Sequence, residues 1–258
     1  EYGFYWYFQQ DGAIQFEVKL TGIMHTGALK PGDKRPFGRL VAPQLYAPNH
    51  QHMFNIRMDM MVDGPRNSIY ETHNEVEPLG PSNPHGNACR SKATLLRTET
   101  EAQQMVDPLN ARSWKITSSE NKNRLGEPTA YRLHPGENVR CFLDPSSTVM
   151  KRASFMGKHL WVTPYEASEK YATGDYPNQH AGGADLAAYA SGNRPIENEN
   201  LVVWYTMGAN HMPRPEDWPV MPVVHIGFML KPDGFFERNP ALDVPPSPGR
   251  HHCDATKH

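Results

Sequence analysis

Residues 49–57 read Asn49-His50-Gln51-His52-Met53-Phe54-Asn55-Ile56-Arg57. Apolar side chains recur at every second position after the histidines, which is typical of a strand with one face in a core. Because residues i and i+2 of an extended strand point to the same face, His50 and His52 are predicted to stand side by side on the core face. The stretch therefore predicts both a β-strand and a pair of neighbouring imidazoles.

The same two-residue alternation occurs elsewhere in the chain, whereas helical periodicity is scarce. Residues 14–20 alternate between apolar and polar side chains, and the Asp11-Gly12 pair before them is a turn signal. We therefore predict a hairpin between residues 2–9 and 13–20. Segments rich in β-branched and aromatic residues predict further strands at 91–105, 114–116, 131–133, 158–163, 201–206 and 223–230.

Pro, Gly and Asn mark the segments that we expect to be loops. These are residues 27–38, 65–90 and 172–200, with a helical turn at 107–113 and a short helix at 184–190. The chain has 24 prolines, which suit loops and sheet edges better than helix interiors. We predict an all-β fold, one large antiparallel β-sandwich with long loops and few short helices, over residues 1–245, followed by a mobile tail over 246–258.

The composition argues against several classes of function. The net charge is −2 and there is no basic block, so nothing points to nucleic acid, and no apolar run approaches the roughly 20 residues of a membrane span. The aromatic start lacks the basic flank of a signal peptide, so we expect an intracellular protein, in the peroxisome or the cytoplasm. The cysteines, Cys89, Cys141 and Cys253, follow no zinc spacing, and their odd number leaves at least one free or paired with another chain.

With 13 histidines among 258 residues, a chance His-x-His pair is nearly expected, so the motif alone says little. Two neighbouring imidazoles on an apolar face, however, need partners for their ring nitrogens, and a metal ion supplies them. His211 follows the predicted strand at a Gly208-Ala209-Asn210 turn, where it is expected at the mouth of a sandwich. An all-imidazole site suits copper or zinc, and tetragonal geometry with a water favours copper(II).

Two other interpretations compete with a copper site. A cupin-type site also uses His-x-His on a strand, but it requires a Glu four or five residues beyond the second His. This chain has Ile56 and Arg57 at those positions, which argues against a cupin. The second alternative, a non-catalytic β-sandwich that serves as an interaction module and whose histidines are structural, stays open.

Two longer strings carry a family resemblance, namely WYTMGANHMPRPEDWPVMP at 204–222 and GFFERNPALD at 234–243. Together with Asn49-His50-Gln51-His52 and Arg57-Met58-Asp59, they resemble the copper amine oxidases, and the resemblance runs from residue 1 to about 245. The Pro-Arg-Pro-Glu-Asp-Trp-Pro string at 213–219 is the most specific part, since a plain sandwich has no reason to place it beside a histidine.

The resemblance implies the oxidative deamination of a primary amine to an aldehyde, with dioxygen as acceptor and with release of ammonia and hydrogen peroxide. It implies copper(II) held by His50, His52 and His211, and topaquinone, a quinone cofactor made from a tyrosine of the protein. It also implies a homodimer, with hairpin arms that reach the partner; the segment 65–135 is a candidate arm.

In the family, the cofactor tyrosine lies in the pattern Asn-Tyr-Asp/Glu-Tyr, and Glu1-Tyr2 match its last two positions. The quinone tyrosine is therefore expected immediately before Glu1, and the catalytic Asp base is expected further upstream. The resemblance thus places the copper ligands, but no catalytic residue, within the 258 residues, as in a segment of a longer polypeptide.

The resemblance also implies a second, hard-cation site for an ion such as calcium or manganese. Its ligands would be Asp59, the carbonyl of Met60, Asn200 and the carbonyl of Leu201. The family has Asp at the position of Asn200, and the missing charge weakens the site.

Other residues have competing explanations. Met221, ten residues beyond His211, stands where family members place a Met near the copper, although core packing explains it equally well. Glu216 and Asp217 flank prolines, so we expect them to form salt bridges within a loop rather than an acid/base pair. The histidines expected to be structural or solvated are His25, His159, His180 and His225, while His251 and His252 lie in the predicted tail.

Overall fold

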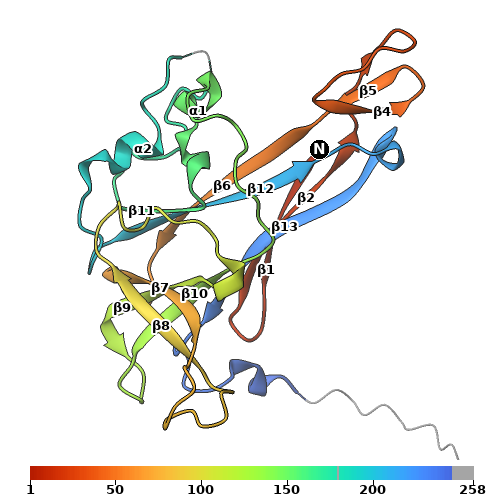
Figure 1. The fold of residues 1–258 in the computed structure, drawn as a ribbon. Coiled ribbons are helices and arrows are strands. Elements are labelled where there is room, and N and C mark those ends of the chain that lie inside the picture. Colours follow the sequence, from red (N-terminus) through yellow and green to blue (C-terminus); the bar gives the residue numbers. More distant parts are fainter. Residues whose placement is uncertain (179, 246–258) are drawn as a thin grey trace, which may run out of the picture.

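The computed structural model of the chain describes residues 1–178 and 180–245, so the predicted tail over 246–258 lies outside the described residues (Figure 1). Strands dominate, which confirms the predicted all-β class. The helical segments are short: α1 (Thr148–Arg152), α2 (Leu186–Tyr189), η1 (Pro108–Asn110), η2 (Ser154–Gly157), η3 (Ala190–Gly192), η4 (Pro215–Asp217) and η5 (Pro240–Asp243). No helix in the described ranges is long and apolar enough to cross a membrane.

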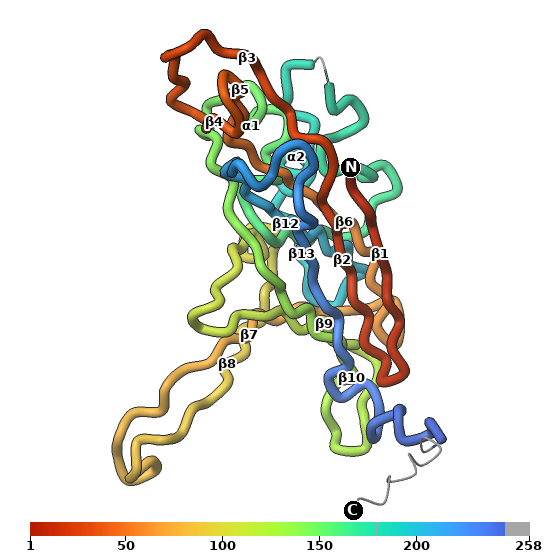
Figure 2. The backbone as a smooth tube through the Cα atoms, turned by 90° about the vertical axis from the view of Figure 1, so that its right-hand side faces the viewer, coloured from red at the N-terminus to blue at the C-terminus, as the bar shows by residue number. Residues whose placement is uncertain are grey.

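The largest sheet is antiparallel and has seven strands in the order β1-β2-β13-β10-β9-β7-β8. Their bounds are β1 (Tyr2–Phe8), β2 (Ile14–Ile23), β7 (Asn67–Val76), β8 (Cys89–Leu96), β9 (Ser113–Lys122), β10 (Pro128–Pro135) and β13 (Val220–Pro232). The β7–β8 hairpin extends away from the body of the molecule (Figure 2). The predicted hairpin at the start is confirmed, because β1 pairs with β2 from Tyr2 opposite Leu20 to Phe8 opposite Ile14.

A smaller antiparallel sheet packs against the large one and has the order β11-β12-β6. Its strands are β6 (His50–Met60), β11 (Leu160–Pro164) and β12 (Leu201–His211). A third sheet is made of β3 (Gly27–Ala28), β4 (Gly38–Ala42) and β5 (Leu45–Pro48). It lies at the N-terminal end of β6 (Figure 1). The two long neighbours β6 and β12 are the elements that position the candidate site.

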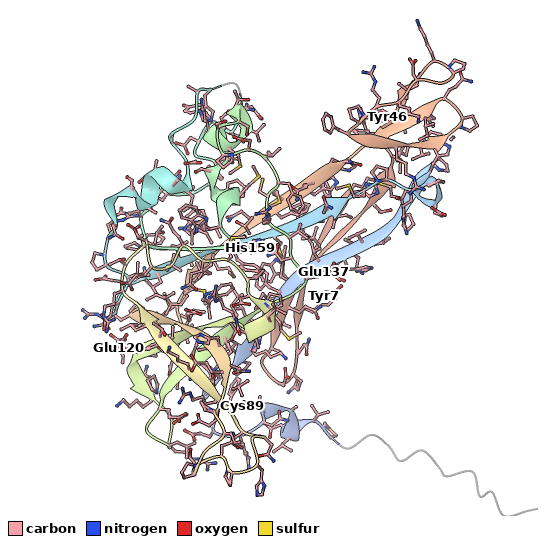
Figure 3. All side chains as sticks on the ribbon, in the orientation of Figure 1. Tyr7, Tyr46, Cys89, Glu120, Glu137 and His159 are labelled. Carbon is pink, nitrogen blue, oxygen red and sulfur yellow. The ribbon has the colours of Figure 1, made fainter. Side chains whose placement is uncertain are left out.

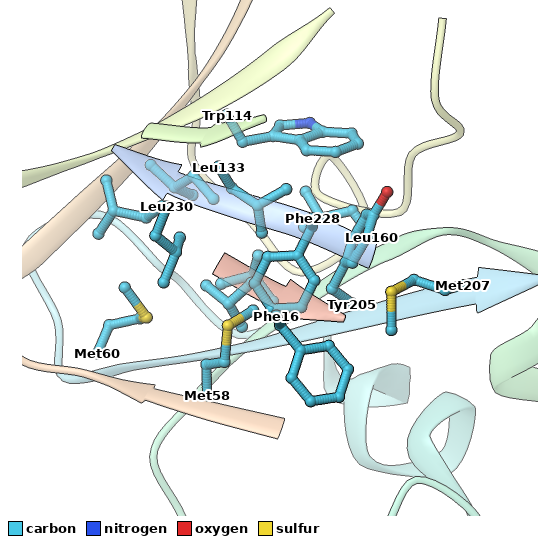
Figure 4. Close-up of a cluster of buried hydrophobic side chains, with 14 of the residues drawn as sticks. Phe16, Met58, Met60, Trp114, Leu133, Leu160, Tyr205, Met207, Phe228 and Leu230 are labelled. Carbon is cyan, nitrogen blue, oxygen red and sulfur yellow. The ribbon is translucent and has the colours of Figure 1, made fainter. Parts of the chain in front are cut away.

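The main core lies between the seven-stranded sheet and the β11-β12-β6 sheet (Figure 4). Phe228 of the seven-stranded sheet packs its ring 5.3 Å from that of Tyr205 in the smaller sheet and 5.5 Å from that of Phe16, measured between centroids. On β6, Met58 is buried while its neighbour Asp59 is exposed. The even positions of β6 therefore face the core, as the alternation in residues 49–57 predicts.

One predicted loop is wrong in part. Residues 65–90 were expected to form a surface excursion, yet 67–76 form β7, which pairs with both β8 and β9. Two buried residues of β7 are polar, namely Asn67 and Thr72, which lie on opposite faces of the strand. Because the strand buries polar groups that are hydrogen-bonded, its sequence lacks the apolar alternation that marks the other strands.

An ion-pair cluster ties β10 and β9 to the residue that follows β13. Arg132 Nε donates to Asp233 Oδ2 at 2.8 Å, and Lys115 Nζ lies 3.4 Å from Asp233 Oδ1. Burial opposes ionisation of Asp233, but the two cations outweigh it and hold the pKa of this carboxyl below its usual range.

This cluster predicts a pH-dependent contribution to stability. A carboxyl whose folded-state pKa is lowered stabilises the fold above its unfolded pKa of about 3.9, and this stability is lost as pH falls through the folded pKa. We expect Asp233→Asn to lower the unfolding temperature of the full-length protein near neutral pH, by an amount that shrinks at about pH 3. Thermal melts at the two pH values measure this, with the exposed Asp33→Asn as control; a difference that stays constant with pH would contradict it.

Candidate metal centre

Strands β6 and β12 bring together the three histidines predicted as ligands. The strands pair antiparallel along their whole length, with His50 opposite His211 and His52 opposite Ala209. Directly paired residues share a sheet face, so the three imidazoles stand on one face. The ring centroid of His50 lies 4.8 Å from that of His52 and 4.8 Å from that of His211.

His211 reaches this face by a different route from the one predicted. Residues 208–210 do not turn, because β12 runs straight through them to His211. Gly208 instead permits a close approach: a Cβ at this position would lie 2.5 Å from the carbonyl oxygen of Val139. Asn138 accepts a hydrogen bond from the Gly208 N–H at 2.8 Å, so the loop after β10 packs directly on β12.

Two of the rings have one nitrogen held by an acceptor of the protein. His50 Nδ1 lies 3.0 Å from the carbonyl oxygen of Pro48, and His211 Nε2 lies 3.0 Å from Oδ2 of Asp217. A carbonyl or carboxylate oxygen only accepts, so both nitrogens donate their N–H. Partners of this kind fix the orientation and tautomer of metal-binding histidines.

The other nitrogens of these two rings face each other. His50 Nε2 and His211 Nδ1 are 3.3 Å apart. In neutral rings both carry lone pairs, because each ring has already committed its single N–H. Two nitrogens bound to one ion at about 2.0 Å, with an angle of roughly 90–110°, would lie about 2.8–3.3 Å apart. The spacing therefore fits a shared cation.

Asp217 is the group that fixes His211. Its carboxylate is 2% exposed and also accepts from the backbone N–H of Arg214 at 2.9 Å and from its guanidinium at 2.8 Å. The bonds from Arg214, and then the bond from His211, outweigh burial and lower the pKa of Asp217 to about 2. The salt bridge within this loop was predicted, but the contact with His211 was not.

His52 has a partner from the first strand. Its Nδ1 lies 2.9 Å from the hydroxyl of Tyr2. A hydroxyl both donates and accepts, so this contact leaves either tautomer of His52 open. Burial lowers the pKa of His52, and the neighbouring His50 and His211 reinforce the shift. The neutral imidazole, which is the metal-binding form, is therefore favoured.

The three histidines open into a cavity of about 510 Å³. Glu1 and Tyr2 form part of its wall, and Met221 of β13 forms another part. Among the described residues, no group of three or more His, Cys, Asp or Glu side chains has the arrangement of a formed metal site. The three histidines thus gather their ring nitrogens at one place, with the tautomers of His50 and His211 fixed by Pro48 and Asp217.

The residues expected at a second cation site lie at the opposite end of the same strand pair. Leu201 pairs with Met60, and Val202 pairs with Asp59, which is exposed. Asn200 Oδ1 is buried and has no hydrogen-bond partner among the described residues. An orphaned buried acceptor costs about 1–3 kcal/mol, so a ligand there would relieve it.

Two of the other histidines, His159 and His225, have ordinary protein partners, whereas His180 Nε2 is buried without a partner among the described residues. His159 is buried, accepts from the N–H of Val106 through Nδ1 and contacts the carbonyl of Val139 through Nε2, at 3.0 and 3.2 Å. His225 Nδ1 lies 2.6 Å from Oε1 of Glu17. His25 is exposed and lines the cavity of the three histidines, which its sequence context did not indicate.

Comparisons with known proteins give one family. The family model described as copper amine oxidase, enzyme domain, matches residues 1–251. Histamine oxidase of Arthrobacter globiformis is 48% identical over 251 residues, which are 97% of this chain and 36% of that protein. The peroxisomal copper-containing diamine oxidase 1 of Nicotiana tabacum is 47% identical, over 95% of this chain and 32% of that protein.

A solved structure gives the same result. The crystal structure of a copper-containing benzylamine oxidase from Hansenula polymorpha superposes with a TM-score of 0.90 at 34% identity, over 95% of this chain and 39% of that chain. The chain thus spans about a third of the length of the relatives that it matches.

Proposed function

Because the chain belongs to the copper amine oxidase family, we propose that it supplies the copper ligands of a primary-amine oxidase, His50, His52 and His211. The observation that carries the proposal is the pair of lone-pair nitrogens on His50 and His211, which face each other at 3.3 Å. Their tautomers are fixed by Pro48 and Asp217, so the donor set is arranged before any ion arrives.

The donor set fits copper(II) in its chemistry. All three donors are imidazoles, and burial favours the neutral form of His52. Imidazole donors suit copper, zinc, iron and nickel, and water in a remaining position would allow the tetragonal geometry that copper(II) prefers. When bound, copper and topaquinone supply the redox chemistry by which a primary amine becomes an aldehyde and dioxygen becomes hydrogen peroxide.

The described residues have positioning roles in this proposal. The histidines hold the ion, while Met221 and Ala209 contribute apolar wall to the cavity. Glu1 and Tyr2 line the same cavity, which supports the expectation that a quinone tyrosine directly before Glu1 would lie beside the ion. The catalytic Asp base is expected in a part of the protein outside these 258 residues.

The substrate class and the cellular location are proposed from the names of relatives, and the homodimer is proposed from the shape of the β7–β8 hairpin. Relatives are named for oxidation of histamine, a diamine and benzylamine, so we assign this protein a primary amine. The extended β7–β8 hairpin suits an arm of a homodimer (Figure 2). Three relatives are named as peroxisomal, which supports an intracellular location. We propose that residues 1–245 form one sandwich domain.

Metal addition to the copper-free full-length protein tests the function. Copper(II) and air should produce a coloured quinone that reacts with phenylhydrazine, and a primary amine should then release hydrogen peroxide. Protein that binds one copper per chain but forms no phenylhydrazine adduct would overturn the oxidase and favour the non-catalytic sandwich.

The second cation site gives a separate prediction. We propose that Asp59, Asn200 and the carbonyls of Met60 and Leu201 bind calcium or manganese weakly, because Asn200 lacks the charge that hard cations prefer. Asn200→Asp should raise calcium affinity by about 10-fold or more, since ligand charge tunes such sites. Titration calorimetry measures the change, with the exposed neighbour Asn198→Asp as control; equal affinities in both variants would remove the site.

A further inference from the structure

A second cavity lies on the other face of the β6–β12 pair. Its volume is about 510 Å³, and Gln51 and Met53 line it from β6, at odd positions of the strand. Asn210 pairs with Gln51 and lines the cavity from β12. His50 lines both this cavity and the one that holds the three histidines. The two cavities are therefore neighbours across the end of one strand pair.

Sulfur atoms gather around this second cavity. Met53, Met156, Met212 and Cys141 line it, and Cys141 Sγ lies 3.8 Å from Met150 Sδ. They come from five segments of the chain: strand β6, the loop before α1, α1 itself, η2 and the residue after β12. Three methionines thus line the cavity with Cys141, and a fourth, Met150, contacts its thiol.

Hydrogen bonds place Cys141 there. Gln51 Nε2 donates to the carbonyl of Arg140 at 2.9 Å, and Gln51 Oε1 accepts from the N–H of Phe142 at 2.7 Å. The backbone on both sides of Cys141 is therefore attached to β6. The thiol is half-buried, and the adjacent Phe142 is exposed, so the cavity is reached from solvent.

The distance between the two sulfurs matches a shared metal ion. Two sulfurs that each lie about 2.3 Å from one ion, at a near-tetrahedral angle, are about 3.8 Å apart. Soft thiolate and thioether donors select copper(I) among the biological metals. The rest of the wall is largely apolar, and one thiolate with a monovalent ion leaves no net charge to bury.

We propose that Cys141, which lines the cavity, and Met150, which lies behind it, form a copper(I) site completed by a thioether from the cavity wall. The ion displaces the thiol proton to solvent and forms a Cu–S bond, with no change of oxidation state. The site is independent of the three-histidine centre, since it uses none of its nitrogens. His50 lines both cavities, so the proposed site adjoins the three-histidine centre.

Copper(I) competition tests the site in the full-length protein. Under anaerobic, reducing conditions, the protein competes with a coloured copper(I) chelator for added copper(I). Wild-type protein should hold one more tightly bound copper(I) per chain than the Cys141→Ser/Met150→Leu variant, whose affinity at this site should fall at least about 10-fold. X-ray absorption at the copper edge should show sulfur neighbours at about 2.3 Å in wild type, and these should be lost in the variant.

Cys89→Ser/Met61→Leu is the matched control, because both residues are exposed and lie away from the cavity (Figure 3 shows Cys89 on the β7–β8 hairpin). The control should bind copper(I) like wild type. Equal copper(I) binding in wild type and in Cys141→Ser/Met150→Leu, or only nitrogen and oxygen neighbours in wild type, would overturn the proposal. Removal of copper(I) binding by His50→Ala alone, with the sulfurs intact, would do so too.

Discussion

Full-length protein carrying His211→Ala should retain no stoichiometric copper and form no quinone. The substitution removes one of the three imidazoles and leaves His50 Nε2 without the nitrogen that faces it at 3.3 Å. The loss should exceed the roughly 10–100-fold that removal of an outer partner of a metal ligand costs. Copper content after dialysis and the yield of the phenylhydrazine adduct measure the two effects. His50→Ala and His52→Ala should behave in the same way.

His25→Ala is the control for these three variants. His25 lines the same cavity, but it is exposed and does not stand on the β6–β12 face. It should keep wild-type copper content and quinone yield. A ligand variant that forms a normal amount of quinone would remove that histidine from the assignment, and copper loss in His25→Ala alone would move the site to the other side of the cavity.

The shared face of His50 and His52 was predictable because it depends only on the sequence pattern of their own strand. Strand periodicity in residues 49–57 gave the shared face of His50 and His52, and it needed no knowledge of the partner strand. The segment before His211 predicted its position at the end of a strand, but its role as a third candidate ligand came from the family resemblance. The pairing of His50 with His211 joins residues 161 apart in sequence, and no short-range pattern encodes that register.

The predictions that failed concern residue types that occur for more than one physical reason, namely a glycine and buried polar residues. Gly208 was predicted to be part of a turn, but it lies within strand β12. A side chain is not tolerated there because the carbonyl of Val139 packs directly against it. The buried polar residues Asn67 and Thr72 made β7 hard to recognise in the sequence. The Thr72 hydroxyl donates to the carbonyl of the distant Ser113, whereas the Asn67 amide bonds the backbone of the preceding turn at Val62. Tyr2 reaches His52 only because β1 lies over the core face of β6, which is again a long-range arrangement.

Asp217 shows how a partner of a candidate metal ligand can look merely structural. It caps the short turn η4 together with Arg214, and this local role was visible in the sequence. The same turn brings the carboxylate back to His211, six residues earlier, at 3.0 Å. A carboxylate residue that follows a candidate ligand after one turn bounded by prolines is therefore a candidate hydrogen-bond partner of that ligand.

Asp217→Asn should weaken copper binding by about 10–100-fold, although the variant retains the His211 imidazole. The Asp217 carboxylate accepts from His211 Nε2 and from two N–H groups of Arg214. An amide has one oxygen and one NH₂ group, so it cannot accept all of these bonds. If the NH₂ group faces His211, Nε2 must accept, and the proton moves to Nδ1. That tautomer points an N–H at the place where the ion should bind.

This reasoning separates a wrong tautomer from a lost ligand. High copper(II) concentration should restore copper content and quinone formation in Asp217→Asn, but it should not restore them in His211→Ala. Arg214→Ala is the matched control, because it removes the salt bridge within the loop and leaves the carboxylate bonded to His211. Arg214 is exposed, so this control should reduce copper affinity less than Asp217→Asn does. Equal losses in the two variants would show that Asp217 acts only by holding its loop.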